Sequence, residues 1–241
     1  MKGQRVSKMV EDYLQIIWKA QEWPDGSVST NEIAETLAVT PSSVSANLKK
    51  LARDGLIDYE PYGSISLTPA GQEIAIMVVR RHRVLETYLV ERLGLGWDEV
   101  HTEAHSLEHA VSDFVLDRMD QVLGHPACDP HGDPIPRADG SIARSTERNS
   151  AARLSEIDPG TDGRVIRISD HEPEILQYLE EREIAVGTHF HLDERSPAVG
   201  SVSISRSSAP GESADRVEIA IGAADAVWVS SDPHPVGPPD F

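Results

Sequence analysis

The sequence predicts a mainly α-helical protein with α+β parts, arranged as an N-terminal winged helix-turn-helix, a helical domain and a small C-terminal β-barrel. Three helical segments followed directly by a two-stranded ribbon have the order of a winged helix. Long helical segments come next, and beyond residue 153 the chain turns to short runs of strand character. The 241 residues are enough for domains of ordinary size, each with its own core.

The first helices are predicted from apolar spacing and from helix caps. Apolar residues recur at helical spacing between Val10 and Trp18. Ser29, with Glu32 three residues later, has the form of a capping box for a second helix. Thr40 followed by Pro41 places a capping hydroxyl before a proline at the first position of a third helix.

The segments after the third helix complete the predicted winged helix and begin the helical domain. Two extended runs, 56–59 and 64–67, flank a turn and predict the ribbon. A long helix is then predicted over 69–93. A further helical stretch covers 97–123, with a break near Ser112.

The C-terminal part is predicted to be β-rich. Residues 125–153 are rich in Pro, Gly, Asp and Ser, which indicates a linker or surface loop. Strands are expected at 164–168, 184–190, 201–205 and 216–221, with a short helix at 172–183. The expected boundaries are 1–72 for the winged helix, 73–140 for the helical domain, 141–153 for the linker, 154–230 for the barrel and 231–241 for a flexible tail.

The charge is unevenly distributed along the chain. The formal net charge of -18 is unexpected for a DNA-binding protein, because phosphate binding depends on Lys and Arg. Residues 1–83 hold 10 of the 22 Lys and Arg and 10 of the 40 Asp and Glu, so they are neutral overall, while residues 84–241 hold the other 12 and 30. A basic face is therefore expected only in the N-terminal part.

Cysteine content and hydropathy indicate in which part of the cell the protein is expected. Cys128 is the single cysteine, so no internal disulfide forms. No stretch approaches the roughly 18 uninterrupted apolar residues of a membrane span, and the N-terminus has no apolar signal core. We expect a cytoplasmic protein with no membrane partner.

The third helix begins with small and polar residues, as a DNA-reading helix requires for close approach to the major groove. Hydroxyl groups are suited to phosphates, an asparagine to a base, and Lys and Arg to the backbone. The predicted DNA contacts are Thr40, Ser42, Ser43, Asn47, Lys50 and Arg53. An ordinary three-helix domain with a serine-rich cap is the alternative, but it does not require the ribbon that follows at the correct distance.

A cluster of histidines and one glutamate predicts a metal site. His101, His105, Glu108 and His109 follow one another at i, i+4, i+7 and i+8, which places them on one face of a helix. A lone histidine is usually structural, whereas three with a carboxylate indicate metal binding. His82 with the glutamate one turn later forms a second two-ligand pair.

Two other classes of function remain open on these residues alone. The run from His105 to His109 has the H-x-x-E-H pattern of zinc peptidases, in which the glutamate is the general base. A peptidase needs an open coordination position and a substrate cleft, and here the pattern follows a winged helix. A metal-storage or metal-delivery protein is the other alternative.

The sequence resembles the iron- and manganese-dependent repressors related to the diphtheria toxin repressor, and especially their actinobacterial manganese branch. The similar segments extend from the first helix to Pro136, and the C-terminal part resembles the SH3-like domain of that family more weakly. The matching motifs are Val-Thr-Pro-Ser-Ser-Val-Ser, Arg-Asp-Gly-Leu, Arg-Arg-His-Arg-Val-Leu-Glu, Trp-Asp-Glu-Val-His, Leu-Glu-His-Ala-Val-Ser-Asp and Asp-Pro-His-Gly-Asp-Pro-Ile-Pro.

The resemblance implies two metal sites. The primary site would consist of Asp12, His105, Glu108 and His109, and the ancillary site of His82, Glu86, His101, His171 and Glu174. The first-helix ligand is methionine in the iron-type repressors and aspartate in the manganese type, so the aspartate here implies Mn(II).

Two departures from the family pattern affect the choice of metal. His105 stands where cysteine or glutamate is usual, and its imidazole keeps Fe(II), Co(II) and Zn(II) in consideration. Gln15 stands where some manganese sensors have a second acidic ligand, which disfavours a closely spaced binuclear site at the first helix.

The function that the resemblance implies is a non-enzymatic, Mn(II)-activated transcriptional repressor that binds palindromic operators as a homodimer and controls metal-uptake genes. An Fe(II)-activated repressor of the same family is the alternative. Residues 110–119 and the apolar positions Val78, Val79 and Leu85 are the expected dimer core. His125, Cys128 and His131 have zinc-like spacing, and we interpret them as part of a structural loop.

Overall fold

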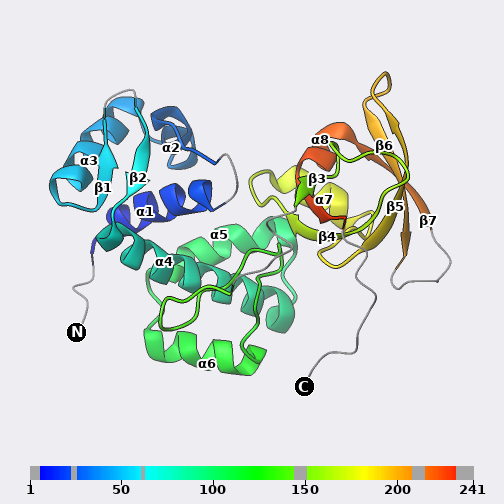
Figure 1. Ribbon diagram of the computed structural model, residues 1–241. Helices are drawn as coiled ribbons and strands as arrows, with labels where there is room; N and C mark the ends of the chain where they lie inside the picture. The colour runs from blue at the N-terminus through cyan, green and yellow to red at the C-terminus, as the bar shows by residue number, and fades with distance from the viewer. Residues whose placement is uncertain (1–5, 23–25, 61–62, 144–150, 208–214, 232–241) are drawn as a thin grey trace.

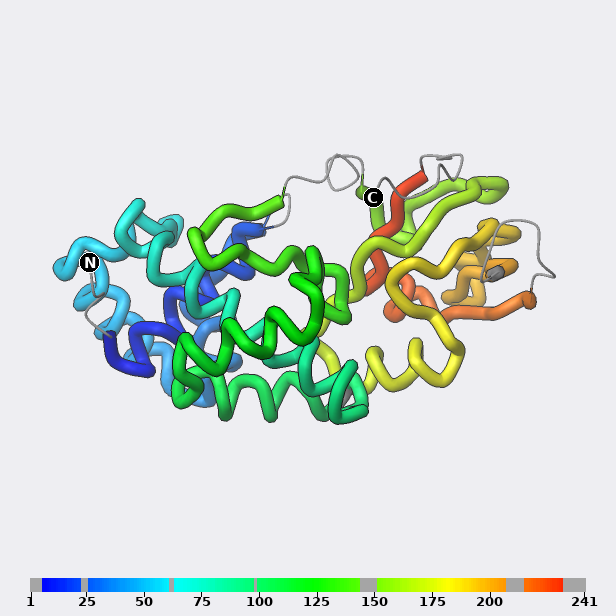
Figure 2. The backbone as a smooth tube through the Cα atoms, turned by 90° about the horizontal axis from the view of Figure 1, so that it is seen from below, coloured from blue at the N-terminus to red at the C-terminus, as the bar shows by residue number. Residues whose placement is uncertain are grey.

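The computed structural model describes residues 6–22, 26–60, 63–143, 151–207 and 215–231. Figure 1 shows a winged helix, a group of helices and a β-rich domain, with α5 (Trp97–Glu108) lying between the first and the last. The same order is visible in the perpendicular view of Figure 2. The predicted fold class is therefore confirmed. Within the described residues, no helix is both long and apolar enough to cross a membrane.

The winged helix has the elements expected from its local signals. They are α1 (Lys8–Gln21), α2 (Thr30–Thr36), α3 (Pro41–Arg53), β1 (Ile57–Tyr59) and β2 (Ile65–Leu67). The Ser29 side chain accepts a hydrogen bond from the backbone of Glu32, whose carboxylate accepts one from the Ser29 backbone, so the capping box is present. The Thr40 side chain caps α3 by accepting a hydrogen bond from the backbone of Ser43. Tyr13 and Leu14 of α1 are buried in the core that these elements share.

The helical domain consists of α4 (Pro69–Tyr88), a π-helical turn η1 (Leu89–Leu93), α5 and α6 (Asp113–Leu123). The predicted break is confirmed, because Ser112 accepts a hydrogen bond from the backbone of Val115 and starts α6. The predicted long helix ends in η1, where Gly94 adopts a positive φ of 72°. His109 follows the last residue of α5 as its C-cap and keeps a helical backbone.

The C-terminal domain is a six-stranded antiparallel sheet in the order β3-β8-β4-β5-β6-β7. Its elements are β3 (Ala152–Arg153), β4 (Asp162–Ile168), α7 (Pro173–Glu180), β5 (His189–Ser196), β6 (Ser201–Ser207), β7 (Asp215–Ala220), α8 (Ile221–Asp225) and β8 (Val227–Ser230). β3, α8 and β8 were not expected from the sequence. The proline-rich tail predicted at 231–241 lies outside the described residues from 232 onward, as does most of the predicted linker, 144–150.

The strand predicted at 184–190 is wrong over most of its length. Ile184 is fully buried, but residues 185–188 form a turn in which the backbone N–H of Thr188 donates to the carbonyl of Ala185. Gly187 has a positive φ of 93°, which a strand cannot accommodate. The strand begins only at His189 and continues to Ser196.

Candidate metal centre

Four side chains from two domains meet beside α5. Asp12 projects from α1, His105 and Glu108 from α5, and His109 from the C-cap, and one ligand atom of each lies within 4.8 Å of the others. His109 Nε2 is 2.8 Å from Asp12 Oδ1 and 3.4 Å from Glu108 Oε1. We call these residues the first group. It contains all four residues expected at the primary site.

The first group suits a divalent cation. The buried atoms Asp12 Oδ1 and His109 Nε2 make no hydrogen bond of acceptable geometry among the described residues, although they lie 2.8 Å apart. Burial raises the pKa of Asp12 in spite of the nearby His109 and His105. The two histidines therefore do not fully offset the cost of burying the negative charge of Asp12, and a bound cation would. Two carboxylates with two imidazoles are a donor set that divalent transition metals accept.

Two further side chains hold the first group in position. Glu11 Oε2 lies 2.7 Å from His109 Nδ1, and Arg81 pairs with the other oxygen of Glu11 at 3.5 Å. Gln15 donates a hydrogen bond from its amide to Glu108 Oε2 at 3.2 Å. Neither Glu11 nor Gln15 was expected in this role from the sequence. The available signal was the spacing of Glu11 and Gln15, which are one helical turn apart and border the buried stripe of α1.

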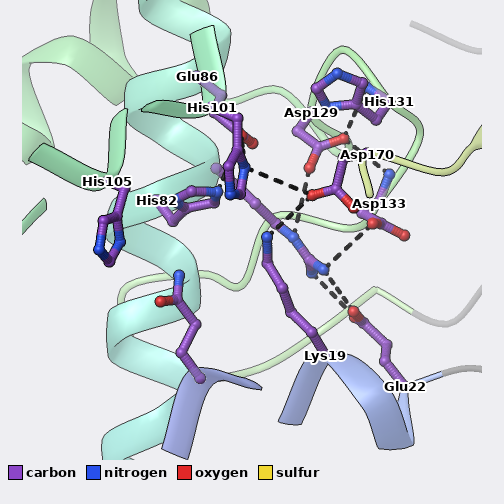
Figure 3. A network of polar contacts seen from close by, with 12 residues as sticks. Lys19, Glu22, His82, Glu86, His101, His105, Asp129, His131, Asp133 and Asp170 are labelled. Atoms are coloured by element: carbon purple, nitrogen blue, oxygen red, sulfur yellow. Dashed lines mark hydrogen bonds and ion pairs between the residues drawn. The ribbon is translucent and has the colours of Figure 1, made fainter. Parts of the chain in front are cut away.

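A second group lies on the side of the first that faces the C-terminal domain. It consists of His82 and Glu86 from α4, His101 from α5 and Asp170, which follows β4, again with ligand atoms within 4.8 Å of one another. Glu86 Oε1 is 2.9 Å from His82 Nε2 and 3.1 Å from His101 Nδ1. In Figure 3, His101 and Lys19 both point toward the carboxylate of Asp170.

The C-terminal domain contributes a different residue from those expected. Among the described residues, Asp170 completes the second group, whereas His171 and Glu174 are exposed and lie outside it. Asp170 also accepts a hydrogen bond from Lys19 Nζ of α1 at 3.0 Å, so it connects the winged helix to the C-terminal domain. Burial opposes its charge, but Lys19 and His101 hold the pKa of Asp170 well below its usual range.

The charges of His82, Glu86 and Glu108 shift one another's pKa values. Burial alone would lower the pKa of His82, but the charge of Glu86 and hydrogen bonds to Glu108 and Glu86 outweigh it and raise the pKa to about 9. Burial opposes the charge of Glu108 as well, and His105 and His82 nevertheless hold its pKa well below the usual range. These carboxylates are therefore ionised and available as ligands at neutral pH.

The expected DNA-reading residues lie on α3 and at its N-cap. Five of them are exposed: Thr40, Ser42, Ser43, Lys50 and Arg53. Asn47 is half-buried, and its amide donates a hydrogen bond to the Tyr13 hydroxyl at 3.0 Å. The side chain expected to reach a base is thus also a contact between α3 and α1.

Comparison with family models divides the chain into three matching parts. Residues 5–65 match the iron dependent repressor N-terminal DNA binding domain, and residues 68–137 match the iron dependent repressor metal binding and dimerisation domain. Residues 152–231 match the FeoA domain, which is the SH3-like type expected for this part.

Curated relatives are transcriptional repressors. The diphtheria toxin repressor of Corynebacterium efficiens is 36% identical over 71% of this chain and 74% of its own length. The iron-dependent repressor IdeR of Mycobacterium leprae is 34% identical over 67% of this chain and 72% of its own. The peptidase and storage alternatives therefore have no support from the relatives.

Solved structures agree with this assignment. A manganese-dependent transcriptional repressor in complex with manganese is 43% identical, with a TM-score of 0.82 over 92% of this chain and 99% of that one. ScaR with bound Zn²⁺ is 28% identical, with a TM-score of 0.72 over 92% of this chain. The chain belongs to the diphtheria toxin repressor family and is a metal-dependent transcriptional repressor, not an enzyme.

Proposed function

We propose that this chain is a Mn(II)-activated repressor that binds palindromic operators as a homodimer and controls metal-uptake genes. Asp12, His105, Glu108 and His109 would be its primary ligands. The observation that carries the proposal is the 2.8 Å contact between Asp12 on the winged helix and His109 on the helical domain. A ligand set divided between two domains allows metal binding to control how those domains are oriented.

The residues of the first group reach the DNA-reading helix through a short chain of contacts. Asp12 is next to Tyr13, whose hydroxyl accepts a hydrogen bond from Asn47 of α3. When Asp12 and His109 bind the same ion, α1 is fixed against α5, and α3 is fixed with it. The two DNA-reading helices of a dimer then keep one spacing, which matches two half-sites of a palindrome.

The donor set favours Mn(II). Asp12 supplies a hard carboxylate oxygen, which suits manganese better than a thioether sulfur does. The similarity to a manganese-dependent repressor structure supports this choice. Fe(II) is the second candidate because His105 adds an imidazole and curated relatives are named iron-dependent repressors. Co(II) and Zn(II) suit the same imidazoles.

We propose the second group as the ancillary site, with His82, Glu86 and His101 as ligands. Asp170 would be the ligand from the C-terminal domain, in the role that the sequence had suggested for His171 and Glu174. Its carboxylate is 3.8 Å from His101 Nδ1 and is already shared with Lys19.

Exposed apolar side chains on α6 support a homodimer. Phe114 is 71% exposed and Val122 is 57% exposed, which is unusual for large apolar residues unless a partner covers them. Val78, Val79 and Leu85 were expected in the dimer core, but they are buried within the subunit. The proposed dimer surface therefore consists of α6 and excludes those α4 positions.

Metal-dependent DNA binding tests the proposal. We would select a duplex from random DNA with the Mn(II)-loaded protein, and then titrate its binding against buffered free Mn(II), Fe(II), Co(II) and Zn(II) under reducing conditions. The expected result is half-maximal binding within the range of free Mn(II) found in cells, with Fe(II) requiring more than its cellular level. Binding that is independent of metal would contradict the proposal, and activation by Fe(II) alone would favour the second candidate.

A further inference from the structure

A cation that belongs to the chain itself lies against the second group. Lys19 of α1 reaches Asp170 with its ammonium group, and Nζ is 3.0 Å from Oδ2. The same Oδ2 lies 3.8 Å from His101 Nδ1. We propose that Lys19 competes with the metal ion of the second group: it holds Asp170 in the metal-free protein and is displaced when the ion binds. This rests on the proposed assignment of the second group as the ancillary site.

The second group has the donors for a divalent cation without the help of Lys19. The buried His82 Nε2 makes no hydrogen bond of acceptable geometry among the described residues, although it lies 2.9 Å from Glu86 Oε1. The group offers two imidazoles and two carboxylates with ligand atoms within 4.8 Å of one another. Such a set suits Mn(II), Fe(II) or Zn(II).

The positive charge of Lys19 acts directly on the second group. Burial lowers the pKa of Lys19, but the charges of Asp170 and Glu86 outweigh it, so that the pKa is raised. The side chains of Lys19 and Asp170 are only 19% and 9% exposed, so water screens their charges weakly. A divalent ion among the same carboxylates would therefore lie close to a poorly screened ammonium group, and the two cations would repel each other strongly.

Lys19 is more weakly anchored than the neighbouring cation, Arg83, whose charge opposes its own. The Arg83 guanidinium donates to Glu22 Oε1 at 3.0 Å and to the carbonyl of Pro134 at 2.7 Å, as part of the network in Figure 3. Among the described residues, Asp170 is the one acceptor of the Lys19 ammonium. When an ion adds positive charge here, Lys19 is therefore the cation that leaves.

The displaced side chain has space to move into. Lys19 lines a cavity of about 1160 Å³ between the winged helix and the C-terminal domain. Glu32 and Glu35 of α2 line the same cavity and are exposed. An ammonium group that leaves Asp170 therefore reaches water while it remains near negative charge.

Displacement of Lys19 changes which domain holds the winged helix. The pair of Lys19 and Asp170 joins α1 to the C-terminal domain, whereas Asp12 and His109 of the first group join α1 to the helical domain. An ion in the second group removes the first connection, and an ion in the first group strengthens the second. Lys19 thereby raises the metal concentration at which the winged helix is released from the C-terminal domain.

Amine labelling of the full chain tests whether Asp170 holds the Lys19 ammonium. The protein is acetylated briefly, and each lysine is quantified by mass spectrometry. In chelator, Lys19 should react about 10-fold more slowly than Lys8, an exposed lysine of the same helix, and in saturating Mn(II) its rate should rise about 10-fold while that of Lys8 stays constant. Asp170→Asn should give the fast rate in chelator. A Lys19 rate that does not rise in Mn(II), or a slow rate in Asp170→Asn, would overturn the proposal.

Two further variants separate this effect from activation at the first group. Asp12→Ala leaves the second group intact and should keep the rise in Lys19 labelling, whereas His101→Ala should lose it. The opposite pattern would assign the rise to the first group and overturn the proposal. Because labelling does not involve DNA, a failure of metal-dependent DNA binding would contradict the proposed function and leave this result unaffected.

The affinity of the second group for Mn(II) gives an independent measurement. Asp12→Ala serves as the background, and Lys19→Met is compared in it with Lys8→Met. Methionine keeps an unbranched side chain but removes the charge, so calorimetric titration should show Mn(II) binding about 10-fold more tightly in the Lys19→Met variant. Equal or weaker binding would show that Lys19 does not compete with the ion.

Discussion

His82 connects the two metal groups through both of its ring nitrogens. Nδ1 lies 2.8 Å from Glu108 Oε2 of the first group, and Nε2 lies 2.9 Å from Glu86 Oε1 of the second. If one nitrogen binds an ion, the other still orients a carboxylate, and such supporting contacts commonly change metal affinity about 10- to 100-fold. Occupancy of the second group should therefore change affinity at the first.

We predict that His82→Ala raises the free Mn(II) needed for half-maximal DNA binding about 10-fold more than His101→Ala does. Both substitutions remove one residue of the second group, but His101 makes no contact with Glu108 among the contacts of the described residues. Fluorescence anisotropy with the selected duplex measures the shift. Equal shifts in the two variants would show that the His82 contact does not couple the groups.

Glu11 should contribute to metal affinity without being a ligand. Glu11→Gln weakens the 2.7 Å contact that orients His109, so Mn(II) affinity at the first group should fall about 10-fold. Glu73→Gln, on an exposed position of α4, is the control and should have no effect. Calorimetric titration with Mn(II) makes the comparison, and matching affinities in the two variants would argue against an orienting role.

The raised pKa of His82 predicts how the stability of the metal-free protein depends on pH. Because the pKa rises from 6.5 to about 9 on folding, protonated His82 stabilises the fold fully below pH 6.5, and this contribution is lost as the pH rises through about 9. Melting temperatures in chelator should fall over this range more steeply for the unaltered protein than for His82→Asn. Parallel curves would contradict the prediction.

Lys19 should matter most when no metal is bound. Lys19→Met leaves the half-buried Asp170 without its 3.0 Å ion pair, and because breaking a fully buried pair costs about 3–5 kcal/mol, a loss at or below the lower end of that range is expected. In saturating Mn(II) the difference from the unaltered protein should shrink, since Asp170 then has another positive partner. Lys8→Met, exposed on the same helix, is the control. Denaturant unfolding with and without Mn(II) gives both values, and an equal loss in each condition would argue against Asp170 as a ligand.

Local signals explain why most of the fold could be predicted. The caps at Ser29, Thr40 and Ser112 depend on hydrogen bonds within three residues, and all three are present. The run at 184–190 has apolar residues typical of a strand, but packing buries Ile184 ahead of a turn. Such an outcome depends on contacts that are distant in the sequence.

Only part of the candidate site could be predicted from the sequence, because only part of it follows from local spacing. Helical spacing placed His105, Glu108 and His109 together, whereas Asp12 was expected only from the family resemblance. Asp170 was missed because it lies in a connection between β4 and α7, where no periodicity predicts the direction of a side chain. The neighbouring His171 had the more conspicuous residue type, yet it is exposed. The interpretation of His131 as structural rested on the resemblance of its loop to a segment of the family, which does not reveal how deeply the ring is buried.

The central claim is that Asp12 couples metal binding to DNA binding. The most direct measurement compares Asp12→Ala with the unaltered protein in binding the selected duplex at increasing free Mn(II), with dimer formation and melting temperature checked in parallel. The account predicts that Asp12→Ala remains a folded dimer and loses the Mn(II)-dependent increase in DNA affinity. Undiminished Mn(II)-dependent binding by Asp12→Ala would contradict it.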